Sequence, residues 1–143
     1  MAQGTLQFRV DAPPERAFAL LGDLTRAPEW VPDLVSVEQV GDGPVGVGTR
    51  YHEVVRMGGK TSEAELEVTD YDPPRLFAHK GRGGPASFTG RFVLEPDGSG
   101  TRVTHEYSVQ LSGLAKLMTP MIAGWVRKNA EAATTNVQGL LRG

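Results

Sequence analysis

The sequence predicts an α+β fold in which a curved, seven-stranded antiparallel sheet wraps around one long C-terminal helix. Residues 112–142 of the 143-residue chain carry an apolar stripe of helical period. At about 1.5 Å per residue this helix would be ~45 Å long, which is too long for a flat sheet of a small domain to cover. Most of the preceding chain alternates polar and apolar residues, as half-buried strands do. A sheet that curls around such a helix leaves space beneath it, so we also expect an internal cavity.

The N-terminal part of the chain predicts one strand followed by two short helices. Residues 5–11 alternate with the period of a strand. Asp11 then precedes Pro13-Pro14-Glu15, a helix-start pattern with a capping acid and prolines in the first turn. A second helical turn is expected at residues 25–30, because Pro32 follows it.

Six further strands are expected, and turn residues separate them. Hairpin-length connections such as Gly58-Gly59 favour antiparallel pairing. The stretch Gly81-Arg82-Gly83-Gly84-Pro85 is interpreted as a hairpin tip, since no helix with a Lys-Ser/Thr pair follows it as in a phosphate loop. The expected strands span residues 34–40, 49–57, 60–71, 75–80, 87–95 and 101–111.

The composition argues against several classes of protein. The formal net charge is −2 and no basic stripe is present, so we expect no nucleic-acid partner. The absence of cysteine excludes disulfides and thiol nucleophiles and suits a cytoplasmic protein. No signal-peptide pattern and no apolar run of about 18 residues is present, so stable membrane insertion is not expected. We therefore expect one domain over residues 1–143, as a monomer or homodimer.

Five short motifs, in order along nearly the whole chain, resemble the START-like, or SRPBCC (Bet v 1-like), superfamily. Its bacterial polyketide cyclase/dehydrase-like branch is the most similar. The resemblance implies a helix-grip fold with a cavity between the sheet and the C-terminal helix. Because members include ligand-binding proteins, aromatase/cyclases and lipid carriers, it implies no single activity. The motifs are Asp11-Ala12-Pro13-Pro14-Glu15, Pro28-Glu29-Trp30, Gly46-Val47-Gly48-Thr49, Tyr71-Asp72-Pro73-Pro74 and Gly100-Thr101-Arg102-Val103-Thr104.

The alternation within each strand assigns the side chains that face the expected cavity. This inward set is mostly apolar, as small-molecule pockets are. On the helix, one stripe continues the same surface and also includes Leu114 and Leu117. The family resemblance further implies that Trp30 packs where the short helices meet the sheet. The predicted ligand-binding residues are Tyr51, Val55, Leu66, Phe77, Phe88, Phe92, Met118, Met121, Ile122, Trp125 and Asn129.

Four polar residues of the inward set, Glu53, His79, His105 and Tyr107, are candidates for acid/base chemistry. Histidine exchanges a proton near neutral pH, and a neighbouring carboxylate tunes its pKa. In this hypothesis Glu53 orients a histidine, and His79 or His105 acts as acid or base. Tyr107 or Tyr51 then donates a hydrogen bond to a substrate oxygen. The alternative is a ligand-lining or structural role, because one β-bulge or register shift would turn each side chain to solvent.

The histidines do not favour a metal site. His52, His79 and His105 lie on different expected strands, and His52 is expected to point outward. We expect no cofactor, since the sequence contains no nucleotide-binding fingerprint. The predicted function is binding of a small hydrophobic or aromatic molecule. The alternatives are a polyketide aromatase/cyclase-like enzyme that cyclises or dehydrates its substrate, and a lipid or quinone carrier.

Pro120 interrupts the predicted C-terminal helix. Either Thr119 caps a new helix with Pro120 in its first turn, or the helix bends there. In both cases residues 114–119 form a partly independent segment beside the expected cavity mouth. We expect this segment and the glycine-rich tip at 81–85 to gate ligand entry.

Overall fold

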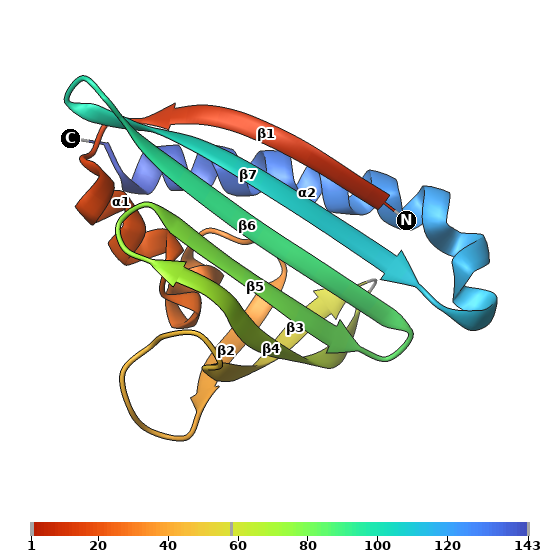
Figure 1. Cartoon of the computed structure of the whole chain (residues 1–143). Coiled ribbons are helices and arrows are strands. Elements are labelled where there is room, and N and C mark those ends of the chain that lie inside the picture. Colours follow the sequence, from red (N-terminus) through yellow and green to blue (C-terminus); the bar gives the residue numbers. More distant parts are fainter. Residues whose placement is uncertain (1, 58, 143) are drawn as a thin grey trace.

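The computed structural model describes residues 2–57 and 59–142, apart from the side chain of Met57. Gly58 of the expected turn and the predicted inward side chain of Met57 therefore lie outside the described residues. Within this part of the chain, seven strands form one antiparallel sheet in the order β1-β7-β6-β5-β4-β3-β2 (Figure 1). The strands are β1 (Ala2–Val10), β2 (Leu34–Val40), β3 (Arg50–Met57), β4 (Lys60–Asp72), β5 (Leu76–Gly83), β6 (Ala86–Asp97) and β7 (Gly100–Leu111).

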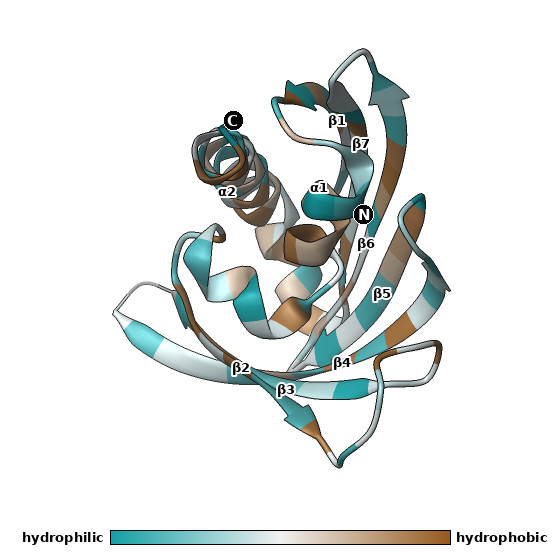
Figure 2. Cartoon of the chain, turned by 90° about the vertical axis from the view of Figure 1, so that its left-hand side faces the viewer, coloured by the Kyte–Doolittle hydropathy of each residue, from teal (hydrophilic) through white to brown (hydrophobic). Residues whose placement is uncertain are grey.

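The helices all lie on the concave side of this sheet. The sheet curves around α2 and the short helices, which confirms the predicted helix-grip architecture (Figure 2). Two of the helical segments connect the edge strands β1 and β2, and the other two follow β7. The segments are α1 (Pro14–Leu21), the 3-10 helix η1 (Leu24–Glu29), the 3-10 helix η2 (Gly113–Met118) and α2 (Thr119–Leu140).

The helix start after β1 differs from the prediction. Pro13 occupies the N-cap position of α1 and no side chain caps the helix, while Asp11 instead pairs with Arg9. Proline suits this place because the first helical N–H groups have no partner within the helix. In η1, the Asp23 carboxylate accepts from Thr25 N at 3.1 Å, so this segment begins earlier than predicted.

The helical segment expected at residues 112–142 is divided at Thr119, next to the interruption expected at Pro120. η2 precedes α2, and Thr119 is the first residue of α2 instead of its cap, with its hydroxyl donating to the Lys116 carbonyl at 2.7 Å. Pro120 lies in the first turn of α2, as expected if a new helix begins at this point instead of one helix bending there. The break changes the helical phase, so Leu114 and Leu117, predicted to face inward, are 87% and 82% exposed.

The glycine-rich stretch at 81–85 is mostly strand and only partly turn. Gly81 and Gly83 belong to β5, and Gly84-Pro85 makes the connection to β6. A Cβ atom at Gly81 would collide with the ring of Phe88 on the neighbouring strand. Glycine is therefore needed at this position because a neighbouring side chain packs directly against the backbone. In the sequence alone, such a strand glycine looks the same as a glycine in a loop.

One end of the molecule is filled by α1 and the C-terminal half of α2. The ring of Phe18 packs edge-on against Tyr71 and Phe77, with centroids 5.5 and 6.3 Å apart. Val137 of α2 is buried in the same cluster. Asn136 Nδ2 also donates to the Trp30 carbonyl at 3.1 Å. These contacts fix the C-terminal half of α2 against the short helices.

Candidate functional site

A cavity of about 520 Å³ lies between the concave face of the sheet, η1 and α2. This volume falls within the roughly 300–1,000 Å³ of typical small-molecule pockets. Twelve of the residues predicted to bind a ligand or exchange protons line it: Glu53, Val55, Leu66, His79, Phe88, Phe92, His105, Tyr107, Met118, Ile122, Trp125 and Asn129.

Three predicted ligand-binding residues, Tyr51, Phe77 and Met121, do not line the cavity. Tyr51 and Phe77 are fully buried in the hydrophobic core, and α1 covers Phe77 through Phe18. Burial raises the pKa of Tyr51 to about 12, so its phenol stays neutral. Met121 lies in the first turn of α2 and is 60% exposed.

Three of the polar side chains of the cavity wall, His79, His105 and Tyr107, come from β5 and β7, the strands on either side of β6. His79 on β5 and Tyr107 on β7 both pair with Gly90 of β6. A Cβ atom at Gly90 would lie 2.6 Å from Cε1 of His79, so glycine makes room for the imidazole over β6. His105 stacks on Phe92 with ring centroids 4.3 Å apart, and its ring is 5.6 Å from that of Tyr107. The register thus gathers both histidines and the tyrosine on one wall.

Burial leaves both cavity histidines neutral at neutral pH. Desolvation lowers the pKa of His79 to about 4. Desolvation, with a smaller contribution from His79, lowers the pKa of His105 to about 4. Glu53 shows the opposite behaviour, because burial raises its pKa to about 7 and the nearby His52 only partly opposes this. Glu53 is therefore the cavity group whose pKa lies nearest neutral pH.

The hypothetical contact between Glu53 and a histidine is not formed. Among the hydrogen bonds of the described residues, none links Glu53 to His79 or His105. Instead His52, on the outer side of β3, contacts Glu63 Oε1 through Nε2 at 2.9 Å. The described part of the chain contains no group of three or more His, Cys, Asp or Glu residues that could hold a metal ion.

η1 contributes residues to the site that were not predicted from the sequence. Trp30, expected to pack between helices and sheet, does so against Phe92 at 5.9 Å and also lines the cavity. Leu24 and Ala27 line the cavity with it. Their spacing of three residues is the signal that would have revealed a 3-10 face. Asn129, predicted to bind ligand, donates its Nδ2 to the Pro32 carbonyl at 2.9 Å and so holds this loop against α2.

Among the described residues, three polar side-chain atoms are buried without a protein partner. They are Trp30 Nε1, Tyr51 OH and His79 Nδ1. A buried polar group without a hydrogen bond costs about 1–3 kcal/mol. Two of the three atoms belong to residues that line the cavity, Trp30 and His79. The mostly apolar lining of the cavity therefore includes residues with polar atoms that have no hydrogen-bond partner within the protein.

The sequence matches, over residues 1–142, the model of a family described as polyketide cyclase / dehydrase and lipid transport. No curated protein matches it. No helix in the described residues is long and apolar enough to cross a membrane.

Several solved structures share the fold of this chain. A START superfamily protein from Mycobacterium smegmatis has a TM-score of 0.80 and 16% identity, over 99% of this chain and 97% of that one. The Zhui aromatase/cyclase from Streptomyces sp. R1128 has a TM-score of 0.78 and 17% identity, over 97% and 92%. A protein from Thermus thermophilus has a TM-score of 0.79 and 23% identity, over 96% and 94%. At these identities the likeness is one of fold.

Proposed function

The chain belongs to the polyketide cyclase/dehydrase and lipid transport family, and we propose that it binds a small hydrophobic or aromatic molecule in the cavity beneath α2. The observation that carries this proposal is the cavity itself, about 520 Å³ in volume and lined mostly by apolar and aromatic side chains. Removal of apolar ligand surface from water contributes about 25 cal/mol per Å². Since the lining is mostly apolar, this term supplies most of the affinity.

The lining favours a flat molecule. Phe88, Phe92 and Trp30 come from the sheet and η1, and Trp125 of α2 also lines the cavity. Aromatic rings interact best with one another in stacked or edge-on arrangements. Met118 lines the cavity and is also 48% exposed, so the opening lies beside η2.

The test uses N-phenyl-1-naphthylamine, an uncharged dye that fluoresces in apolar surroundings. We expect saturable, one-to-one binding to the wild-type protein. Ala115 of η2 lines the cavity, so Ala115→Trp should weaken binding by about tenfold, equivalent to about 1.4 kcal/mol. Ala132→Trp, on the exposed side of α2, is the matched control and should leave the affinity unchanged.

Thermal melting of both variants checks that the fold is retained. Native mass spectrometry of the purified protein then seeks a co-purified molecule of the same class. The proposal fails if the dye does not saturate, or if a folded Ala115→Trp variant binds as tightly as Ala132→Trp.

A second function, cyclisation or dehydration of a polyketide-like substrate, is favoured by the behaviour of Glu53. A general base works best with a pKa near the working pH, and that of Glu53 is raised to about 7. In this reaction Glu53 removes a proton from a carbon beside a ketone. The β-hydroxyl group then leaves as water with the proton that Glu53 accepted. His79 and His105 then orient the substrate.

Conversion of 4-hydroxy-4-phenyl-2-butanone to its enone tests this second function by absorbance. We expect Glu53→Gln to reduce kcat by about 100-fold while dye affinity stays unchanged. Equal turnover by the wild type and Glu53→Gln would exclude Glu53 as the base. Loss of turnover in His79→Ala or His105→Ala alone would assign the proton transfer to that histidine.

A further inference from the structure

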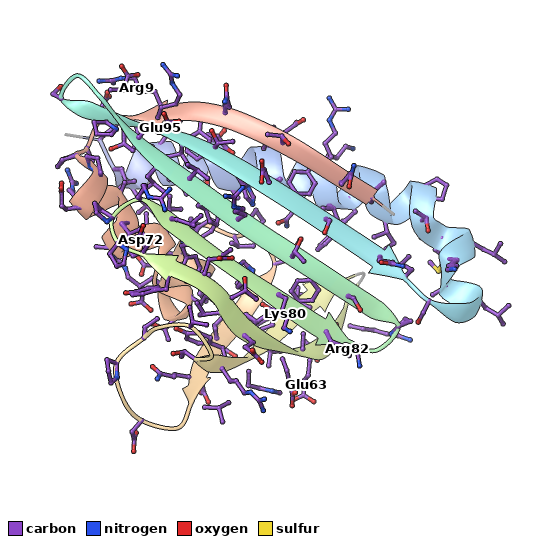
Figure 3. All side chains as sticks on the ribbon, in the orientation of Figure 1. Arg9, Glu63, Asp72, Lys80, Arg82 and Glu95 are labelled. Atoms are coloured by element: carbon purple, nitrogen blue, oxygen red, sulfur yellow. The ribbon has the colours of Figure 1, made fainter. Side chains whose placement is uncertain are left out.

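Among the described residues, the cavity lining contains acidic side chains but no lysine or arginine. Of the 15 lysines and arginines in the sequence, none lines the cavity as it is formed by the described residues. Lys80 and Arg82 instead project from β5 on the face of the sheet turned away from α2 (Figure 3). The carboxylates of the lining are those of Glu53 and Glu63. The Glu63 side chain is 71% exposed and bonds His52, so Glu53 is the carboxyl group nearest a bound ligand.

The cavity histidines do not replace the missing positive charge. His79 and His105 have pKa values lowered to about 4 by burial, so both are neutral at neutral pH. An anionic ligand would therefore lose its hydration without gaining a cationic partner. The effective penalty for burying one unpaired ion is several kcal/mol.

The polar groups of the cavity wall instead suit an uncharged acceptor. His79 Nδ1 is buried and has no protein partner. Orphaned buried N–H groups are rarer than under-satisfied acceptors, so the proton belongs on Nε2, the nitrogen left for the cavity. The Tyr107 hydroxyl on the same wall is a second donor. The Tyr107 hydroxyl lies over Gly4 of β1 and the His79 ring over Gly90 of β6, so a ligand carbonyl or ether oxygen would accept from either group.

We propose that the cavity selects an uncharged ligand that carries a hydrogen-bond acceptor oxygen and rejects carboxylates, sulfonates and phosphates. This inference rests on the proposed binding function and specifies its ligand class. The lack of basic lining residues accounts for the rejection of anions, and the donors of the β5–β7 wall account for the preference for an oxygen. Among apolar metabolites, neutral ketones, quinones and phenol ethers fit, whereas free fatty acids do not.

A matched pair of dyes tests the charge selectivity. N-phenyl-1-naphthylamine is uncharged, and 8-anilinonaphthalene-1-sulfonate has the same ring skeleton with one negative charge. We expect the uncharged dye to bind the wild-type protein at least about tenfold more tightly. Glu53→Gln, which removes the nearest negative charge, should increase the affinity for the sulfonate by about fivefold relative to the affinity for the uncharged dye. Glu65→Gln, an exposed residue of β4, is the control of equal charge change and should alter neither affinity.

A carbonyl-bearing dye tests the acceptor preference. The emission of 6-propionyl-2-dimethylaminonaphthalene moves to longer wavelength when its ketone accepts a hydrogen bond. We expect His79→Phe to move the emission of the bound dye to shorter wavelength. His52→Phe, which changes an exposed histidine outside the cavity, should not.

The outcomes separate this inference from the proposed function. Equal affinities for the two matched dyes, or tighter binding of the sulfonate, would overturn the charge selectivity while the binding function stands. An unchanged emission in His79→Phe would overturn the assigned donor. Saturable binding of none of the three dyes would overturn the binding function, and this inference with it.

Discussion

The two halves of α2 lie over the same sheet but are packed differently. In the half that ends at Leu140, Ala130, Ala133 and Val137 are buried. In the half that begins at Thr119, the described residues up to Lys128 include no buried side chain, and Ile122 and Trp125 line the cavity. At one end the helix completes a core, and at the other it covers a cavity.

The short helices explain this difference. α1 and η1 fill the space between the sheet and α2 at the C-terminal end, where Phe18 and Leu21 belong to the core cluster. The side-chain amides of Asn129 and Asn136 donate hydrogen bonds to backbone carbonyls of the segment that follows η1 and so fix this segment against α2. No corresponding layer of described residues fills the space beneath η2 and the start of α2. The position of two short helices therefore divides one long interface into a core and a cavity.

The largest expected effect is a difference in stability between two valine-to-alanine substitutions, one in each half of α2. Val137 is 1% exposed, so Val137→Ala should lower the free energy of unfolding by about 2 kcal/mol through lost burial and a new void. Val126 lines the cavity and is only half-buried. We expect Val126→Ala to cost less than about 1 kcal/mol in urea denaturation. Equal losses would show that both halves are packed alike.

The pH dependence of stability distinguishes the cavity wall from the core. Burial raises the pKa of Glu53 from 4.5 to about 7, so the native state loses stability as pH rises through this range. The full shift corresponds to about 3 kcal/mol. Because Glu53 is only partly shielded from solvent, we expect the stability of Glu53→Gln relative to the wild type to increase by about 2 kcal/mol between these pH values and to stay constant above them. The buried His79 has the opposite effect on stability. Because its pKa is lowered, the native state loses stability as pH falls toward about 4. This effect is the same in the wild type and in Glu53→Gln. A difference in unfolding free energy that does not vary with pH would contradict the burial of Glu53.

A smaller effect is expected for binding at the open end. Trp125→Ala should weaken binding of N-phenyl-1-naphthylamine by about tenfold, or about 1.4 kcal/mol, because it removes an aromatic side chain from the cavity lining. Leu140→Ala changes an exposed residue at the far end of α2 and should leave the affinity unchanged. Fluorescence titration measures both. If the two variants bind the dye with equal affinity, the binding site lies elsewhere.

Periodicity in the sequence predicted the sheet and the concave side of its strands. Successive strand residues point to opposite faces, so the apolar residues around His105 were enough to indicate its side. The same pattern could not show that α1 covers Phe77, because that contact joins distant segments through Phe18. Nor could it show the phase change at Thr119, since a 3-10 turn and an α-helix share similar short-range patterns.

The electrostatics of the site were also beyond the sequence. The hypothesis assigned proton transfer to the histidines on the basis of their usual pKa. Burial, which depends on the three-dimensional packing, instead lowers the pKa of His79 and raises that of Glu53 toward neutrality. Both residues line the cavity, but the carboxyl group of Glu53 is the one whose pKa lies nearest neutral pH.

Amide hydrogen exchange with and without N-phenyl-1-naphthylamine tests the central claim most directly. In the free protein, residues 113–128 and the Gly84-Pro85 turn should exchange faster than residues 129–140, because only the latter are fixed in the core. Saturation with the dye should slow exchange in residues 113–128 and leave residues 134–140, which do not line the cavity, unchanged. Uniform exchange along α2, or protection by the dye confined to another part of the chain, would contradict a ligand cavity beneath its N-terminal half.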